Sequence, residues 1–184
     1  MGPTATTHIR RATPDDAAAI AAIHVEAWRA AYAGMLPDRY LLGLAEGRQT
    51  RQWRHHVVAR GEATLVAEDI RPLRGGPGIV GFASCGPLRR AGVPADAPWQ
   101  GEVYTLYVAP DHQGHGHGGA LLEACRARLA RDGRAGVLVW VLAANPSRFF
   151  YERMGGRRVA ERTEPFAGAR LPEIAYAWDR PAAH

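Results

Sequence analysis

A glycine-rich loop between an apolar strand and a helix constrains this chain most. Residues 102–122 read Glu-Val-Tyr-Thr-Leu-Tyr-Val-Ala-Pro-Asp-His-Gln-Gly-His-Gly-His-Gly-Gly-Ala-Leu-Leu. The loop's glycines, Gly114, Gly116, Gly118 and Gly119, leave the backbone bare enough for a polyphosphate to approach. The helix that follows directs its unpaired N–H groups and its positive dipole end at the same place. The segment therefore predicts a binding site for a phosphate-bearing cofactor.

The composition excludes two common kinds of phosphate site. The chain contains 23 arginines and no lysine. A Walker A loop needs the lysine of its Gly-Lys-Ser/Thr to reach the phosphates. A pyridoxal phosphate enzyme needs a lysine amine for its Schiff base. Neither class fits this chain.

A dinucleotide-binding fold is the main alternative, because Gly114, Gly116 and Gly119 match Gly-x-Gly-x-x-Gly. In that fold the glycines directly follow the strand, and an acidic residue stands about 20 positions later. Here residues 109–113 separate the strand from the glycines, and the next strand, Val137–Leu142, ends in Ala-Ala-Asn without a carboxylate. The spacing therefore disfavours a dinucleotide.

Length and charge limit the remaining classes. A chain of 184 residues suits one domain, spanning residues 1–184. The net charge is +5, but the arginines are scattered rather than clustered, so we predict no nucleic-acid partner. Cys85 and Cys125 lack a Cys-x-x-Cys pattern and are expected to be buried thiols. No apolar run reaches the roughly 18 residues of a membrane span, and no signal peptide is evident, so we predict a cytoplasmic protein without a membrane partner.

The order of the expected elements is typical of an α/β fold with mixed strand directions. Glu102–Val108, Gly116–Arg131 and Val137–Leu142 form a strand–helix–strand unit, and the last of these is apolar enough to be covered on both faces. Further strands are expected at His8–Arg11, Thr64–Glu68, Ile79–Cys85, Arg157–Arg162 and Leu171–Trp178. Further helices are expected from Thr13 to Tyr32, Pro37 to Leu44, Arg48 to Val58 and Pro146 to Met154.

Three motifs carry a family likeness. Gln113, Gly116 and Gly118 fill the pattern Gln/Arg-x-x-Gly-x-Gly/Ala. Asn145 is followed, after a spacer, by Phe150-Tyr151-Glu152-Arg-Met-Gly155-Gly156, and Trp28-x-x-x-Tyr32-x-Gly34 stands near the start. With these motifs the chain resembles the GNAT superfamily of N-acetyltransferases, which use acetyl-coenzyme A.

Two positions depart from the family pattern. Gly156 replaces the phenylalanine that usually ends the second motif, and Arg148 replaces the small residue usual in its spacer. These departures concern packing and the flank of the cofactor more than the chemistry.

The resemblance implies a GNAT-like mixed, splayed β-sheet of about six or seven strands flanked by helices. The strand Glu102–Val108 would separate from Val137–Leu142, and the pantetheine arm of acetyl-CoA would pair with backbone in the gap. The pyrophosphate would rest on N–H groups of the glycine loop. The implied cofactor-binding residues are Leu106, Tyr107, Val108, Gln113, Gly114, His115, Gly116, His117, Gly118, Gly119 and Asn145. Asn145 fits a helix cap as well as it fits a pantetheine ligand.

Acetyl transfer to a primary amine of a small molecule or peptide needs a base, because an amine with a pKa of about 10.4 is protonated near neutral pH. We predict Glu102, at the spacing of the family's usual base, acting directly or through water. Regular alternation would place Glu102, Tyr104, Leu106 and Val108 on one face of the strand. The alternative is a surface carboxylate.

The other two requirements concern the thioester. An N–H near Tyr107 or Val108 would stabilise the oxyanion. Tyr151, with a phenol pKa of about 10, would donate a proton to the departing thiolate; the alternative is a core tyrosine.

The acceptor site is expected to involve Trp28, Tyr32 and the loop Pro87–Gly101, although Trp28 fits the buried face of its helix better. The acceptor itself stays open, as does the choice between a monomer and a homodimer. A non-catalytic acetyl-CoA sensor or interaction module is the alternative function.

His112, His115 and His117 lie in the same loop, and neutral imidazoles are good zinc ligands. With no cysteine and few acids near them in the sequence, we predict no metal site. We expect exposed rings that offset phosphate charge.

Overall fold

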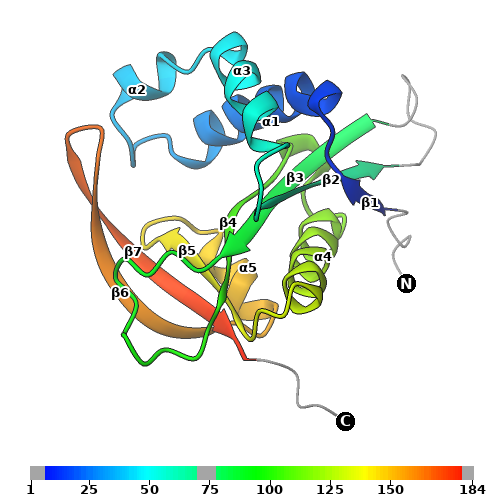
Figure 1. Ribbon diagram of the computed structural model, residues 1–184. Coiled ribbons are helices and arrows are strands. Elements are labelled where there is room, and N and C mark those ends of the chain that lie inside the picture. Colours follow the sequence, from blue (N-terminus) through cyan, green and yellow to red (C-terminus); the bar gives the residue numbers. More distant parts are fainter. Residues whose placement is uncertain (1–6, 70–77, 180–184) are drawn as a thin grey trace.

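A seven-stranded mixed sheet is the centre of the fold in the computed structural model, which describes residues 7–69 and 78–179 (Figure 1). Its strands are β1 (Thr7–Arg11), β2 (Ala63–Asp69), β3 (Gly78–Pro87), β4 (Gly101–Val108), β5 (Val137–Leu142), β6 (Arg157–Phe166) and β7 (Ala169–Trp178). Their spatial order is β1-β2-β3-β4-β5-β7-β6. Only β4 and β5 pair in parallel, joined by the helix between them; the other neighbouring strands are antiparallel. The predicted α/β class with mixed strand directions is confirmed.

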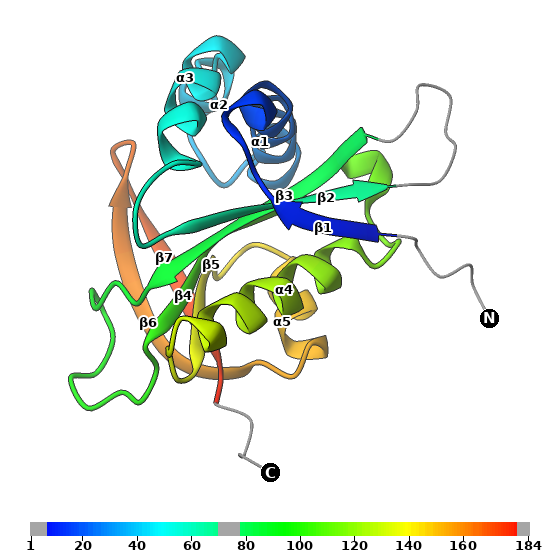
Figure 2. The same ribbon diagram turned by 45° about the vertical axis from the view of Figure 1, so that its right-hand side comes forward.

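Helices cover both faces of this sheet (Figure 2). On one side lie α1 (Ala17–Ala31), the short α2 (Asp38–Leu42) and α3 (Glu46–His56), and on the other lie α4 (His117–Arg131) and α5 (Arg148–Arg153). Short 3-10 turns precede α1 at Pro14–Asp16 and α4 at Pro110–His112. The largest core lies between the sheet and α4 and includes Val103, Leu121, Leu122, Cys125, Leu129 and Tyr176. The apolar residues of α4 recur at helical spacing, so this helix buries one face along the sheet.

The start of the first helix is fixed by a buried acid. The carboxylate of Asp16 accepts a hydrogen bond from the backbone N–H of Thr13, with an N–O distance of 2.7 Å. The same carboxylate forms a two-point ion pair with Arg10 of β1, at 2.7 and 2.9 Å. Arg10 lowers the pKa of Asp16 from 3.8 to about 2. The helix start at Thr13, predicted from its cap residue, is therefore also tied to the sheet.

A β-bulge in β4 opens the sheet. Ser84 of β3 pairs with Thr105, and the next residue, Cys85, pairs with Val103, so Tyr104 is an extra residue in β4. On its other side β4 pairs with β5 only from Gly101 to Val103. Beyond the bulge the two parallel strands separate, as the family resemblance implied.

The bulge also contradicts the predicted alternation of side chains along β4, which put Glu102 on the same face as Leu106 and Val108. Leu106 and Val108 pack into the core on the α4 side, as Val103 does. Glu102, one residue before Val103, lies on the opposite face. Glu102 therefore does not share a face with Leu106 and Val108, because the extra residue at Tyr104 shifts the period by one.

The predicted β6 and β7 are shorter than the observed strands, which form a long hairpin. Its two-residue turn consists of Ala167, with φ of 50°, and Gly168, with φ of 83°. Cys85 and Cys125 are buried free thiols, as expected. No helix in the two described segments has the length and apolarity to cross a bilayer.

Candidate active site

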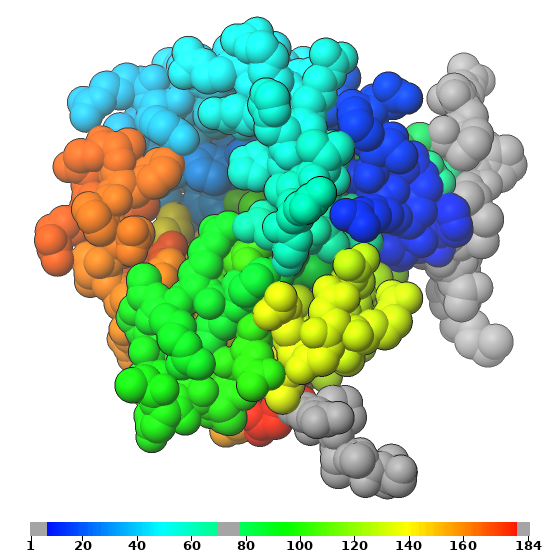
Figure 3. Space-filling model, viewed as in Figure 1, coloured from blue at the N-terminus to red at the C-terminus, as the bar shows by residue number. Residues whose placement is uncertain are grey.

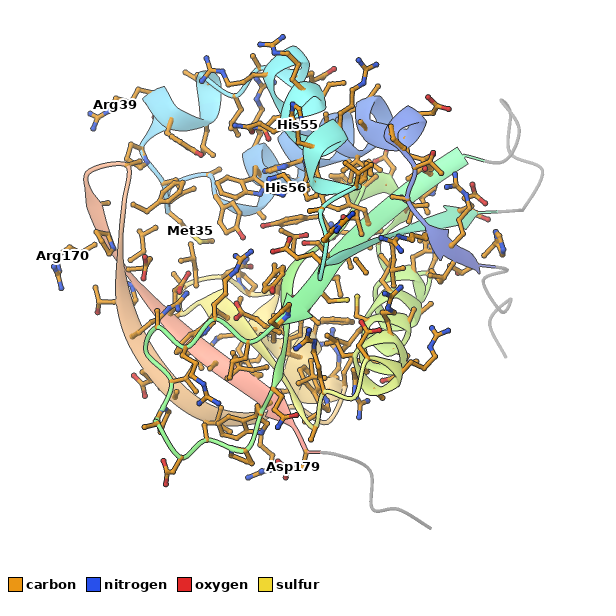
Figure 4. The ribbon with its side chains drawn as sticks, viewed as in Figure 1. Met35, Arg39, His55, His56, Arg170 and Asp179 are labelled. Carbon is orange, nitrogen blue, oxygen red and sulfur yellow. The ribbon has the colours of Figure 1, made fainter. Side chains whose placement is uncertain are left out.

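A cavity of about 980 Å³ occupies the gap between β4 and β5. It extends from the glycine loop before α4 to the segment after α1 and the β6–β7 hairpin. The molecular surface is hollowed between this segment and the hairpin (Figure 3). Met35 lines the cavity there, while Arg39 and Arg170 extend outward beside its mouth (Figure 4). One continuous cavity therefore joins the predicted cofactor loop to the predicted acceptor side.

The glycine loop has the backbone shape that only glycine adopts easily. Gly114 and Gly116 have φ values of 77° and 89°, in the left-handed region. Helix α4 begins directly afterwards at His117, and the first-turn amides of a helix have no intrahelical partner. Gln113 braces the loop, since its side-chain Nε2 donates to the carbonyl of Val108 at 3.1 Å. The loop therefore presents an N–H cluster to the cavity that suits an anion.

The part of β4 that no longer pairs with β5 forms one wall of the cavity. Leu106, Tyr107 and Val108 all line it. The phenol oxygens of Tyr107 and Tyr32 are 3.2 Å apart, and burial raises the pKa of both groups. Two of the predicted site elements, the β4 edge and Tyr32, are thus brought together.

Tyr151 lies on the opposite wall, on α5. Its side chain is 7% exposed and stacks near Tyr176, with ring centroids 6.2 Å apart. Burial raises the pKa of Tyr151, so the phenol keeps its proton. Asn145 also lines the cavity, and its Oδ1 accepts from the N–H of Ser147 at 2.9 Å, which holds the turn before α5. The structure therefore shows a turn contact of Asn145 just before α5, rather than a side-chain cap of the helix itself, at a position that also faces the cavity.

Glu102 lies apart from this constellation. It is 5% exposed, and its Oε2 accepts a hydrogen bond from the backbone N–H of Arg89 at 2.8 Å. Desolvation by burial raises the pKa of its carboxyl group. Among the described residues that line the cavity, Glu102 is absent. Arg162 and Glu173 act on this carboxyl group electrostatically, so Glu102 lies near the end of the cavity that Glu173 lines.

Two other carboxylates do line the cavity, Glu164 of β6 and Glu173 of β7. Arg162 donates to Oε2 of Glu173 at 2.7 Å and stacks its guanidinium 4.1 Å from the Trp140 ring centroid. Trp28, predicted as an acceptor-side residue, lines this end as well and packs beside Phe166, with ring centroids 6.0 Å apart. The end of the cavity away from the glycine loop is therefore lined by aromatic rings and by two carboxylates that share Arg162 as an ion-pair partner.

Residues 60–155 match the family model of the acetyltransferase (GNAT) domain. The uncharacterized N-acetyltransferase YuaI of Bacillus subtilis is 32% identical over 170 residues, which cover 92% of this chain and 91% of that protein. The chain belongs to the GNAT superfamily of N-acetyltransferases. This family assignment makes it an acyltransferase and confirms the predicted enzyme class.

Solved structures show the same GNAT fold. The protein yncA from Salmonella typhimurium, solved with its cofactor acetyl-CoA, is 23% identical, with a TM-score of 0.67 over 97% of this chain and 96% of that one. The PaiA N-acetyltransferase from Thermoplasma acidophilum, solved in complex with coenzyme A, is 16% identical, with a TM-score of 0.65 over 92% and 98% of the two chains. The predicted splayed sheet is confirmed by the fold shared with these enzymes.

The loop histidines of this GNAT chain differ from one another. His115 is exposed, as expected, whereas His112 is partly buried and His117 is fully buried. The expectation of three exposed rings is therefore wrong for His112 and His117. Both face Asp69 at the end of β2, with nitrogen–oxygen distances of 4.0 and 3.5 Å. Packing of α4 against β2 brings these groups together.

No local sequence pattern predicts several of the residues in and beside the cavity. Glu173 and Trp140 belong to strands whose cavity face is defined only once β4 and β5 separate. Asp69 joins the histidines through the tertiary packing of β2 against α4.

Proposed function

We propose that this enzyme transfers the acetyl group of acetyl-CoA to a primary amine of a small molecule or peptide. The observation that carries the proposal is the single cavity that connects the glycine loop, the free edge of β4 and an acidic, aromatic end. The two solved relatives with coenzyme A or acetyl-CoA support acetyl-CoA as the donor.

The donor would bind along the loop and the free edge. Its pyrophosphate would accept hydrogen bonds from amides between Gly114 and Gly119, at the positive end of α4. Its pantetheine amides would pair with the exposed backbone of Leu106, Tyr107 and Val108, as an added strand pairs with a sheet edge.

The acceptor end suits a cationic amine. Glu164 and Glu173 share one cation, Arg162, so this group keeps a net negative charge, and Trp28 and Phe166 supply aromatic faces that attract an ammonium group. Such a pocket would concentrate the protonated amine beside the β4 edge, where the thioester would lie.

Deprotonation of the bound ammonium would fall to Glu173, because it lines the cavity from β7, the strand next to β5, whereas Glu164 lies one strand further from the gap, on β6. Glu102 is buried and does not line the described part of the cavity, so it would take part only through bound water. We therefore assign the direct base role to Glu173 and a relay role to Glu102.

The neutral amine nitrogen would then attack the thioester carbon and form a C–N bond. A backbone N–H near Tyr107 or Val108 would donate to the oxyanion of the tetrahedral intermediate. The C–S bond breaks as the intermediate collapses, and Tyr151 would donate its phenol proton to the sulfur, because burial keeps that group protonated. The nitrogen of the intermediate carries one proton more than the amide product, and this proton would pass through water to the Tyr151 phenolate. Glu173 would release the first proton to solvent.

A thiol-release assay with acetyl-CoA and a panel of amines tests this proposal. Wild type should release coenzyme A with at least one amine. Tyr151→Phe should lower kcat about a hundredfold or more, as expected for loss of a general acid, while calorimetry shows an unchanged Kd for acetyl-CoA. Tyr176→Phe removes a neighbouring hydroxyl that donates to Glu152 at 2.6 Å, and it should leave kcat unchanged.

Two outcomes would contradict the proposal. Acetyl-CoA binding without thiol release for any amine would favour a non-catalytic sensor or interaction module. Equal kcat values for wild type and Tyr151→Phe would remove the assigned acid. The cytoplasmic location, the absence of a nucleic-acid partner and the choice between monomer and homodimer stay predictions.

A further inference from the structure

Beside the glycine loop, three potential metal ligands meet that the proposed acetyl transfer does not use. They are Asp69 at the end of β2, His112 at the end of the 3-10 turn and His117 at the start of α4. One ligand atom from each lies within 4.8 Å of the others. Three separate elements therefore supply a carboxylate oxygen and two imidazole nitrogens to one point.

Two of the three side chains in the cluster are buried, and a hydrogen-bond partner holds the imidazole ring of His117 in one orientation. The side chains of Asp69 and His117 are 1% and 0% exposed, whereas that of His112 is 27% exposed. The Nδ1 of His117 is 2.8 Å from Oγ1 of Thr7, and its Nε2 is 3.5 Å from Oδ2 of Asp69. A partner on one ring nitrogen is what directs the other nitrogen toward a metal in protein sites.

We propose that Asp69, His112 and His117 bind one divalent transition-metal ion of the Zn²⁺ type. Two imidazoles and one carboxylate form a donor set that suits Zn²⁺, Co²⁺ and Ni²⁺. Ligand atoms about 2.1 Å from a tetrahedral ion lie roughly 3.4 Å apart. The distance of 3.5 Å between Oδ2 of Asp69 and Nε2 of His117 matches this value. The distance of 4.0 Å between Oδ2 of Asp69 and Nδ1 of His112 needs only a small movement of the partly exposed His112 ring.

The fourth coordination position would face the cavity. His112 and His117 both line it at the end where the glycine loop lies. A bound ion would therefore keep a position for water or for an anion, as three-ligand zinc sites do. The proposal concerns binding to the protein alone, so it stands or falls independently of acetyl transfer.

Titration of the full-length, chelator-treated protein with Co²⁺ tests the site. Wild type should bind one ion per chain and develop visible d–d absorption, and Zn²⁺ should displace the Co²⁺. His112→Ala removes the half-exposed ligand and should weaken Co²⁺ binding at least tenfold. His115→Ala is the matched control, because His115 is an exposed loop histidine outside the cluster, and it should bind as wild type does.

Asp69→Asn adds a second variant at the buried carboxylate. Its folding is checked by circular dichroism, and the folded protein should also lose at least tenfold in Co²⁺ affinity. No saturable Co²⁺ binding by wild type would overturn the proposal. Equal affinities of His112→Ala and His115→Ala would overturn it as well, because binding would then not involve the cluster.

Discussion

Replacing Gly116 with alanine tests whether the loop before α4 binds a diphosphate. Gly116 has φ of 89°, and a Cβ built there would meet no protein atom within 4 Å. The cost to folding is therefore purely conformational, about 1–2 kcal/mol for a non-glycine residue in the left-handed region. The affinity for coenzyme A should fall as a separate effect, because the methyl group and any relaxation of the loop would disturb the amides that face the cavity.

The expected loss in affinity follows from those amides. A hydrogen bond to a charged group contributes about 1.5–3 kcal/mol, so loss of one amide–phosphate contact weakens coenzyme A binding about 10- to 150-fold. Urea denaturation measures the folding cost, and calorimetry measures the Kd for coenzyme A.

Gly133→Ala is the matched control. Gly133 has φ of 75°, also has no atom within 4 Å of an added Cβ, and lies past the far end of α4, away from the cavity. Both variants should lose similar free energy of unfolding, and only Gly116→Ala should lose coenzyme A affinity. If Gly116→Ala binds coenzyme A as tightly as Gly133→Ala does, the loop is not the diphosphate site.

Three further changes test other parts of the structure. Asp16→Asn should lower the free energy of unfolding by about 2 kcal/mol at pH 7, because the pKa of Asp16 is lowered from 3.8 to about 2. Since the folded-state pKa of Asp16 is depressed, the loss of stability is present above about pH 4 and should vanish as pH falls through about 2. Urea denaturation measures it, and the exposed Asp15→Asn variant, as the control, should unfold at the same urea concentration as wild type throughout. Ala167→Gly should raise stability by up to about 1 kcal/mol, because φ of 50° strains alanine in the β6–β7 turn; an unchanged or lower Tm would contradict this. Glu173→Gln should lower kcat/KM more than Glu102→Gln does, and the reverse order in the thiol-release assay would return the direct base role to Glu102.

Local features of this chain were predictable from the sequence because single residues determine them. Gly114 and Gly116 adopt positive φ values that few other residues tolerate, so the loop before α4 could be expected. The cap at Thr13 and the apolar spacing in α4 likewise depend on near neighbours. These features were sufficient to indicate the fold and the cofactor end of the cavity.

The acceptor end and the histidine cluster depend on distant packing. Asp69 meets His117 only because α4 packs against β2 on one face of the sheet. Glu173 reaches the cavity through the pairing of β7 with β5, where it lies opposite Leu142. No local pattern of residues distinguishes these acids from ordinary strand carboxylates.

The bulge at Tyr104 connects the cofactor gap with the change in the expected base. An extra residue in β4 increases local twist and ends the pairing with β5 after Val103, which frees the backbone of Leu106 to Val108. The same extra residue leaves Glu102 on the sheet face opposite Leu106 and Val108, where its carboxylate accepts a hydrogen bond from the backbone N–H of Arg89. Because β4 contributes no carboxylate to the described lining of the cavity, we assign the direct base role to Glu173, which lines the cavity from β7, the strand next to β5. One inserted residue thus both opens the donor site and transfers the proposed direct base role to another strand.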